Sequence, residues 1–490
     1  MHHFLLVLTF SLAVFQNVMA LPFLPVDNPQ LRSDIERISR AGLLNLPLSS
    51  WPLSQAAVRR ELDKANQEEI PAELIAVVNR VRMAINPIPP KQLPQVSMNL
   101  SASKDPAVLR SFGDTTREQL GATLNVQGSM AGGYYQLATT IVKDPLDEDN
   151  TRFDGSHITY LLGDWWLTAG AIERWWGPGW ASSLVFSNNA RPVPGLSLQR
   201  SVSDPSELPV LNLLGPWSAT AFIGQMDDER AINQAKLLGL SVAFKPHPRV
   251  EIALHRTAQW GGEGRPQSAS NLLKLITGRG DNCYDSECRE DEPGNQLGGI
   301  DVRLELPKFT LYGQLIGEDE ANAWPAKKAW QLGVSGGLQA LGLQGSWYIE
   351  QSDTRCASSK ASGYNCFYNH SIYQSGYRYQ GRAIGASWDN DSRVLSAGAT
   401  LTASNGDIYT VKLHNGELNR DSLASSEPSL HSIAPQGAKL RQYSLAWQRP
   451  TGWGEWSLGA DYSSQRFDEF GRQTRRAGFE AAVTYYWNQR

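Results

Sequence analysis

The sequence predicts an all-β transmembrane protein: an antiparallel β-barrel of the bacterial outer membrane, with a small helical region before it. Three observations carry this prediction. Apolar and polar residues alternate from about Leu93 to the end of the chain, tight and long connections alternate between the strands, and aromatic residues gather at strand ends. A soluble β-sandwich also alternates, but its polar face meets solvent and its strands are usually shorter.

The composition of the 490 residues excludes three other classes of protein. Beyond the first 20 residues, no stretch approaches the ~18 consecutive apolar residues of a transmembrane helix, which excludes a polytopic helical membrane protein. The 16 Trp, 16 Tyr and 14 Phe are too many for a disordered chain. A net charge of −4 argues against nucleic acid as a partner, because binding phosphates needs a basic surface.

Residues 1–20 are predicted to be a signal peptide. An apolar core runs from Phe4 to Phe15, and Val18-Met19-Ala20 offers the small-x-small pattern of a cleavage site. The alternative is an uncleaved membrane anchor, although the apolar run is short for a span and a Pro-rich segment follows it at once.

Residues 21–90 are predicted to form a periplasmic α-helical region. Asn28 can cap a first helix that has Pro29 in its first turn and ends at Gly42. A second helix is expected from about Ser54, and a third from Pro71, with the apolar positions of each recurring at helical spacing.

Residues 91–490 are predicted to form the outer-membrane barrel with long extracellular loops. In one expected strand Trp456, Leu458, Ala460 and Tyr462 alternate with polar or small residues. Pairing each tight turn with the next long loop gives about twenty strands, with an uncertainty of about two. Tight turns are expected at Lys245–Pro248, Pro307, Ser404–Asp407 and Arg449–Gly452, and long loops at 259–296, 351–366 and 415–438.

Four cysteines lie in polar, Gly/Asn/Ser-rich segments. In an exported protein this placement favours disulfides over a metal site, and the spacing lacks the tight C-x₂-C of a zinc ligand set. Three connectivities are possible. The two local pairs, Cys283–Cys288 and Cys356–Cys366, are favoured.

The most unusual stretch runs from Gly163 to Arg200 and carries five tryptophans with interleaved Arg and Asn. Its ERWWGPGW, followed by SNNARPVPG, resembles the signature region of the Wzi family of capsule assembly proteins. The segment LRSDIERISRAGLLNLPLSSWPL near the N-terminus resembles the start of that family. The similarity spans the whole mature chain, with helices first and the barrel after them.

The resemblance implies an outer-membrane barrel of eighteen strands with a small periplasmic helical bundle. It also implies a lectin that binds exported capsular or extracellular polysaccharide and organises it on the cell surface. Outer-membrane lipid and the polysaccharide export machinery are the other partners it suggests, and it implies no cofactor. If eighteen is correct, one or two of the strands counted within 163–202 fold into the lumen instead.

Candidate sugar contacts come from the same segment. Trp offers a flat apolar face for a sugar ring, while Arg and Asn supply donors and acceptors for hydroxyls or acidic groups. The alternative is that the tryptophans cork the barrel and that Arg174 stacks on them. The candidates are Glu173, Arg174, Trp175, Trp176, Trp180, Asn188, Asn189 and Arg191.

The sequence offers no enzyme site. Gly333–Gly337 fits G-x-S-x-G, but it lies in an alternating strand rather than at a strand-to-helix elbow. No zinc-protease motif, P-loop or dinucleotide fingerprint is present, and no metal-ligand set is predicted. Two alternatives to a surface lectin stay open: a sugar porin or diffusion channel, which needs an open lumen, and an outer-membrane hydrolase, which needs a Ser/His/acid set.

Overall fold

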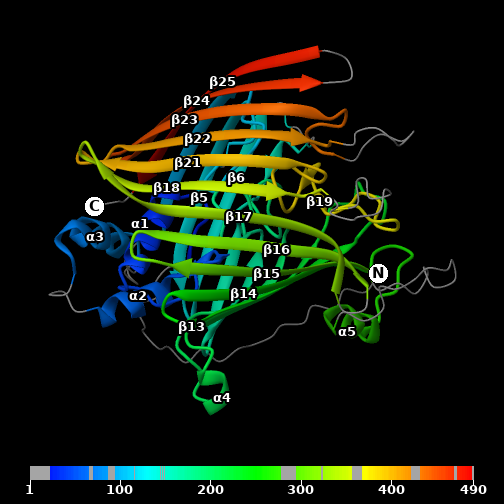
Figure 1. The fold of residues 1–490 in the computed structure, drawn as a ribbon, viewed down its shortest axis with the longest axis horizontal. Coiled ribbons are helices and arrows are strands. Elements are labelled where there is room, and N and C mark those ends of the chain that lie inside the picture. Colours follow the sequence, from blue (N-terminus) through cyan, green and yellow to red (C-terminus); the bar gives the residue numbers. More distant parts are fainter. Residues whose placement is uncertain are drawn as a thin grey trace, which may run out of the picture.

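The chain folds into one closed β-barrel with the N-terminal helices at one end (Figure 1). The computed structural model describes residues 22–65, 70–85, 94–114, 116–143, 145, 147, 149–277, 294–321, 324–355, 367–420, 431–467 and 472–487. The predicted signal peptide (residues 1–20) and all four cysteines lie outside these ranges, so both remain predictions. No helix in the described ranges is long and apolar enough to cross a membrane.

Eighteen strands form the barrel, and β25 pairs with β4 to close it. Every neighbouring pair is antiparallel, and β7 (Thr151–Arg152) adds a short pairing to β6. The barrel strands are β4 (Gln95–Lys104), β5 (Leu120–Met130), β6 (Gly133–Lys143), β8 (His157–Leu162), β9 (Trp165–Gly170), β11 (Gly195–Arg200), β12 (Trp217–Gln225), β13 (Lys236–His247), β14 (Val250–Trp260), β15 (Gly294–Glu305), β16 (Phe309–Ala321), β17 (Trp324–Ala340), β18 (Leu343–Asp353), β21 (Arg393–Ala403), β22 (Ile408–Leu418), β23 (Ala438–Pro450), β24 (Gly454–Phe467) and β25 (Arg472–Trp487).

The smaller elements lie in the connections. The helices are α1 (Pro29–Arg40), α2 (Gln55–Lys64), the 3-10 turn Ala72–Leu74, α3 (Ile75–Ala84), α4 (Pro209–Asn212) and α5 (Ala269–Thr277). The two-residue strands pair as β1 (Phe23–Leu24) with β3 (Leu53–Ser54), β2 (Ser50–Trp51) with β10 (Trp175–Trp176), and β19 (Arg378–Tyr379) with β20 (Arg382–Ala383).

The strand count from the sequence pattern was centred two too high, with eighteen at the edge of its stated range, and the eighteen implied by the family resemblance is confirmed. The excess came from the stretch between β9 and β11. These two strands pair directly with each other, so residues 171–194 leave the wall and fold into the lumen. Each predicted tight turn and long loop lies at a connection between barrel strands, although β13 runs on to His247 and β23 to Pro450, so two of the tight turns are shorter than predicted.

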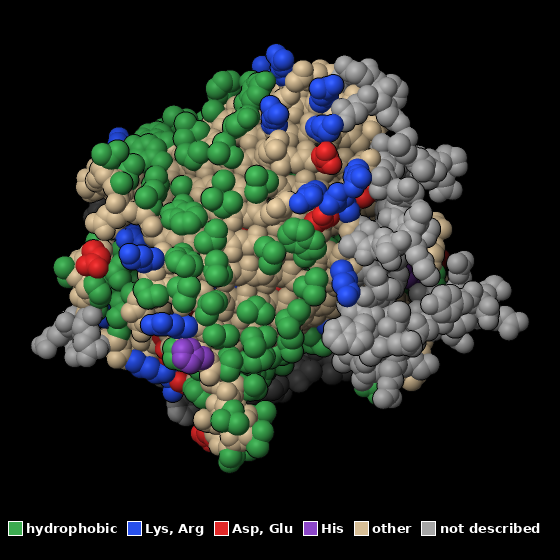
Figure 2. Space-filling model, in the orientation of Figure 1, with side chains coloured by type: hydrophobic (Ala, Val, Ile, Leu, Met, Phe, Trp, Pro, Cys, Tyr) green, Lys and Arg blue, Asp and Glu red, His purple; other side chains and the backbone are tan. Residues whose placement is uncertain are grey.

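The predicted alternation is confirmed in the barrel wall. On β16 the apolar side chains of Leu311 and Leu315 are exposed on the outer face, while Thr310, Tyr312 and Gln314 are buried inside. Figure 2 shows the resulting apolar surface over the middle of the wall, with charged side chains concentrated nearer its edges. Lipid-facing strands need this pattern, since hydrocarbon solvates only the apolar face.

The N-terminal helices α1 to α3 pack against the end of the barrel where the tight turns lie, while α5 lies at the opposite end (Figure 1). The first begins as predicted: the side chain of Asn28 accepts a hydrogen bond from the backbone N–H of Leu31 at 2.8 Å, and Pro29 occupies the first turn. Its buried face includes Ile35 and Ile38 and packs with α2 and α3 in one apolar cluster.

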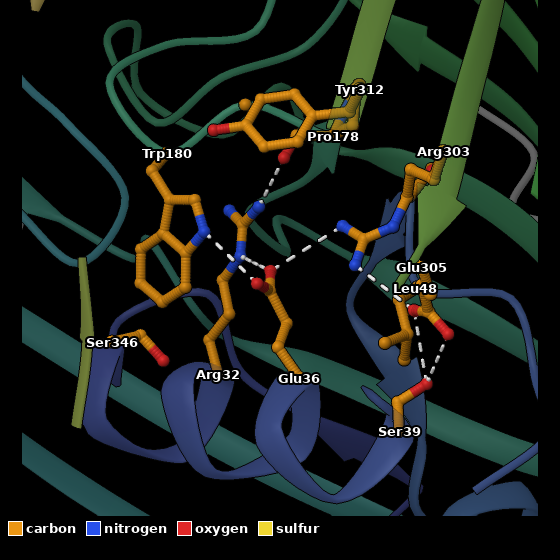
Figure 3. Close-up of polar contacts among 12 residues, drawn as sticks. Arg32, Glu36, Ser39, Leu48, Pro178, Trp180, Arg303, Glu305, Tyr312 and Ser346 are labelled. Atoms are coloured by element: carbon orange, nitrogen blue, oxygen red, sulfur yellow. Dashed lines mark hydrogen bonds and ion pairs between the residues drawn. The ribbon is translucent and has the colours of Figure 1, made fainter. Parts of the chain in front are cut away.

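The polar face of α1 is also buried, because it enters the lumen and meets the charged inner wall (Figure 3). Glu36 lies between the guanidinium groups of Arg32 (3.0 Å) and Arg303 on β15 (3.6 Å). Burial alone would raise the pKa of Glu36, but Arg303, Arg32 and Arg40 outweigh that effect and hold it below its ordinary value. The helix is therefore held in the barrel as an ionised, charge-compensated element.

Irregular backbone inside the lumen is held by inward side chains of the strands. Glu350 on β18 accepts hydrogen bonds from the backbone N–H groups of Trp180 (2.5 Å) and Ala181 (3.0 Å). Gln314 on β16 accepts from the N–H of Leu184 and donates to the carbonyl of Trp176. These side chains supply the hydrogen bonds that a neighbouring strand would otherwise make to the backbone of the segment.

We expect Glu350→Ala to loosen the luminal segment, because it leaves two buried backbone N–H groups without an acceptor. Each such donor costs about 1–3 kcal/mol. The measurement is the unfolding midpoint in detergent, together with protease sensitivity within 171–194. Glu417→Ala, at an exposed position on β22, serves as the control and should leave both unchanged. An E350A variant as stable and protease-resistant as wild type would contradict the assigned anchoring role.

Candidate functional site

The Trp-rich segment 171–194 lies inside the barrel and links its two larger apolar clusters. Trp175 belongs to the cluster of the helical region, where its ring meets that of Phe112 edge-on at 5.3 Å. Trp176 belongs to the luminal cluster and meets Phe186 edge-on at 4.8 Å. Since β10 pairs with β2, the segment joins the N-terminal region to the barrel interior.

The local sequence suits this course. Gly179 lies so close to the wall that a Cβ there would overlap the Gln331 side chain, so only glycine fits without displacing it. Trp180 stacks on Tyr348 with its ring centroid 5.9 Å away. Its indole N–H donates to Glu36 of α1 at 3.3 Å (Figure 3).

Three more predicted contacts are also buried and serve the segment itself. Asn188 donates to the carbonyl oxygens of Ser111 and Asp114, and Asn189 donates to that of Ala383. Arg174 stacks on Phe222, with its guanidinium 3.8 Å from the ring centroid. Burial lowers the pKa of Arg174 to about 9. Residues 171–194 therefore form a plug inside the barrel, which we call the cork. Arg174 stacks on Phe222 rather than on the tryptophans.

The remaining two candidates lie at the margin of the cork. Glu173 lines the large cavity described below and pairs with Arg117 at 2.8 Å. Burial raises the pKa of Glu173, with Arg117 opposing the shift. Arg191 contacts three carboxylates, Asp154, Asp147 and Asp149, at 2.7–2.9 Å. Burial alone would lower the pKa of Arg191, but these carboxylates raise it.

A second loop, 367–392, packs on the cork from the side of the long loops. Asp389 pairs through both oxygens with Arg378, at 2.7 and 3.0 Å, and accepts from the backbone N–H of Ser432. Burial would raise the pKa of Asp389, but Arg378 and His431 hold it well below its ordinary value. His431 accepts from the N–H of Ala434 through Nδ1, and burial lowers its pKa to about 4.

A polar cavity of about 910 Å³ occupies the part of the lumen that the cork leaves open. It lies along β4–β6 and β22–β25. Inward positions Ser97 to Ser103 of β4 all line it, a run of about 20 Å at 3.3 Å per residue. Many lining side chains carry hydroxyl or amide groups: Ser97, Asn99, Ser101, Ser103, Thr123, Asn125, Gln127, Gln136, Thr140, Thr410, Ser444, Gln448, Ser457 and Thr484.

The cavity is acidic, with nine carboxylates and four basic side chains among the described residues that line it. Three of the bases are paired: Arg117 with Glu173, Arg152 with Glu118, and Lys412 with Asp114. The carboxylates are Asp27, Asp105, Asp114, Glu118, Asp154, Glu173, Glu455, Asp461 and Glu480, and the fourth base is Arg110.

The sequence prediction missed this cavity because its candidate sugar contacts were chosen around the tryptophans. The signal was present in the inward positions of the strands. Those of β15, β16 and β18 are bulky, as at Arg303, Tyr312 and Tyr348, and face the cork. Those of β4 are small and polar, and they face open space. Inward side-chain size around the barrel therefore marks which part of the lumen is filled.

Three comparisons with known proteins bear on this arrangement. The sequence model of the family described as Capsule assembly protein Wzi matches residues 90–477. The chain is 30% identical over 437 residues to an uncharacterised 55.8 kDa protein in the cps region of Klebsiella pneumoniae, covering 86% of this chain and 82% of that one.

The third comparison is with a solved structure. Wzi from Escherichia coli is described as an outer-membrane protein involved in group 1 capsule assembly and as a carbohydrate-binding β-barrel. It matches with a TM-score of 0.81 and 25% identity, covering 94% of this chain and 98% of that chain.

The chain belongs to the Wzi family of capsule assembly proteins. Its family and its closed eighteen-strand barrel place it in the bacterial outer membrane, as predicted. In such barrels the tight turns face the periplasm and the long loops face outward. We therefore expect the helical end of this Wzi-family barrel to face the periplasm and loop 367–392 to lie on the cell-surface side.

For this Wzi-family chain we expect Trp176→Ala to act through stability. Removing a fully buried tryptophan costs about 3–5 kcal/mol. The unfolding midpoint of the purified protein in detergent measures the loss, and polysaccharide affinity of the fraction that stays folded should be unchanged. A stable W176A variant that has lost polysaccharide binding would show instead that Trp176 contacts the ligand.

We expect stability on the cell-surface side to fall as pH drops from about 7 to 4. The folded-state pKa of His431 lies below its unfolded value of about 6.5, so the unfolded state binds the proton first. The loss through His431 amounts to at most about 3 kcal/mol. Below about pH 4, protonation of Asp389 adds to it.

Unfolding midpoints at pH 7, 5.5 and 4.5 measure this effect. His431→Gln should flatten the decline, whereas His247→Gln, in an exposed periplasmic turn, should not. An unaltered decline in the H431Q variant would contradict the assignment.

Proposed function

We propose that this protein binds exported capsular polysaccharide at the outer membrane and holds it on the cell surface. Family membership and the carbohydrate binding described for the Escherichia coli relative support the proposal. The structural observation that carries it is the luminal cavity, whose hydroxyl and amide side chains match the hydroxyl groups of a sugar chain. A volume of 910 Å³ lies at the upper end of ligand pockets.

The charge of the cavity defines which sugars suit it. Acidic sugars were expected to pair with arginine, but three of the four bases that line the cavity, Arg117, Arg152 and Lys412, already pair with carboxylates of the protein itself. An added carboxylate would also meet the acidic lining. We therefore propose that neutral sugar residues of the polymer enter the cavity.

The eight sequence candidates then divide into two roles. Glu173 faces the cavity and is proposed to accept hydrogen bonds from sugar hydroxyls. The other seven, which are the buried tryptophans and asparagines with Arg174 and Arg191, are proposed to hold the cork folded and to make no contact with the polysaccharide. We also propose that the protein contacts outer-membrane lipid and the polysaccharide export machinery.

The proposed function includes no catalytic step. Ser335, the centre of the G-x-S-x-G match, lies within β17 and pairs with Thr310 and Tyr348 on the neighbouring strands. A nucleophile elbow needs a sharp strand-to-helix turn at this position.

A diffusion channel is the second candidate function. One observation favours it: the cavity lines β4 over nearly its whole length. Against it, α1 and the segment before it close in on the periplasmic end, and Asp27, Pro29 and Gln30 line the cavity there.

The test uses two tryptophan substitutions on the same strand. Thr123→Trp fills the cavity from its wall, while Leu124→Trp points outward to lipid. We expect T123W to weaken polysaccharide binding by about tenfold or more, and L124W to leave it within about twofold. Binding is measured with purified, detergent-solubilised protein and immobilised capsular polysaccharide. Absence of saturable wild-type binding would contradict the function, and equal binding by the T123W variant would contradict the cavity as the site.

A further inference from the structure

A cluster of basic side chains lies on the outer wall at the cell-surface edge of four adjacent strands. We call it the rim patch, and it consists of Lys439 and Arg441 on β23, Arg466 on β24, Arg475 on β25 and Lys104 on β4. All five side chains are exposed. Figure 2 shows blue side chains gathered along this edge, beyond the apolar surface.

The register places four of the five residues in two rows across the strands, and the fifth, Lys104, lies opposite Phe479, four residues along β25 from Arg475. Ser464 lies directly between Arg441 and Arg475, so these two arginines are two strands apart, about 10 Å at 4.8 Å per strand. In the row nearer the cell surface, Lys439 lies opposite Arg466. On its other side Lys439 lies opposite the exposed Glu417 of β22, so Arg441 and Arg475 are the pair on which the site rests.

The level of the patch relative to the membrane follows from its neighbours. Two residues along β23 and β24 toward the periplasm, Tyr443 and Tyr462 lie opposite each other, exposed, with ring centroids 6.3 Å apart. Exposed Leu445 and Leu458 follow. Outward tyrosines mark the membrane–water interface of a barrel, so the patch lies at the height of the outer-leaflet head groups.

The part of the patch away from β22 carries charge of one sign. Among the described residues of these four strands, no outward position carries Asp or Glu. Within the same ranges Arg441, Arg475 and Lys104 form no ion pair. The one described contact of Arg475 is a weak hydrogen bond to Gln473 at 3.4 Å.

We propose that the rim patch binds the phosphate groups of a phosphorylated glycolipid in the outer leaflet. Arginine presents a planar fork that bonds two phosphate oxygens, and two arginines about 10 Å apart can engage two phosphates of one head group. An acidic polysaccharide is the other anion at this surface. The orientation favours lipid, because these side chains point sideways into the bilayer edge rather than outward from the barrel mouth.

The test is a titration of detergent-solubilised wild-type protein with diphosphoryl lipid A, followed by native mass spectrometry. The double variant Arg441→Gln/Arg475→Gln is compared with Arg249→Gln/Lys308→Gln, which removes the same charge from exposed turns at the periplasmic edge. We expect the rim variant to weaken lipid binding by about tenfold or more and the control to stay within about twofold. Polysaccharide binding by the rim variant should be unchanged.

Two further binding experiments identify which chemical group of the ligand is recognised. Dephosphorylated lipid A should bind the wild type no better than it binds the rim variant, and inorganic phosphate at millimolar concentration should not displace diphosphoryl lipid A. Equal binding of diphosphoryl lipid A by the rim variant and wild type would overturn the proposal. So would a rim variant that keeps lipid binding and loses only acidic polysaccharide.

Discussion

Backbone polar groups inside the barrel must be satisfied, and this one constraint organises the molecule. Outside, hydrocarbon requires apolar side chains, so across the membrane-embedded part of the wall alternation directs the polar strand residues inward. Inside, these polar residues meet irregular chain that has no strand partners. Glu350 and Gln314, with Glu251 on β14, which accepts from the backbone N–H groups of Leu48 and Ser49, supply the missing hydrogen bonds. The same alternation thus builds the lipid face and anchors the cork.

The cork divides the lumen into a filled part and an open part. Where inward side chains are bulky or charged, as at Arg303 and Tyr312, the helix α1 and segment 171–194 pack against them. Where inward side chains are small and polar, as along β4, space remains for a ligand. A barrel arranged in this way suits holding a polymer better than passing solutes, because the cork narrows the path while leaving a wall of hydroxyl and amide groups.

The sequence predicted the barrel, its helical start and its turns because these depend on local, repeating patterns. Asn28, Pro29 and Gly42 mark the first helix by their own conformational preferences, and β16 shows its two faces in its own residues. The inward fold of 171–194 could not be read in this way, since it depends on β9 pairing with β11 across 24 intervening residues. The candidate contacts were chosen by residue type, and type does not report burial: Trp175 and Asn189 are as suited to a core as to a sugar.

The central claim is that the barrel is corked and binds a glycan, and one sample can test it. Purified protein would be assayed for saturable binding of capsular polysaccharide, with an unrelated polysaccharide as control, and reconstituted in planar bilayers for conductance. The account predicts selective, saturable binding and no steady conductance. Steady conductance without polysaccharide binding would contradict it and make the protein a diffusion channel, with the tryptophans of 171–194 as structural filling.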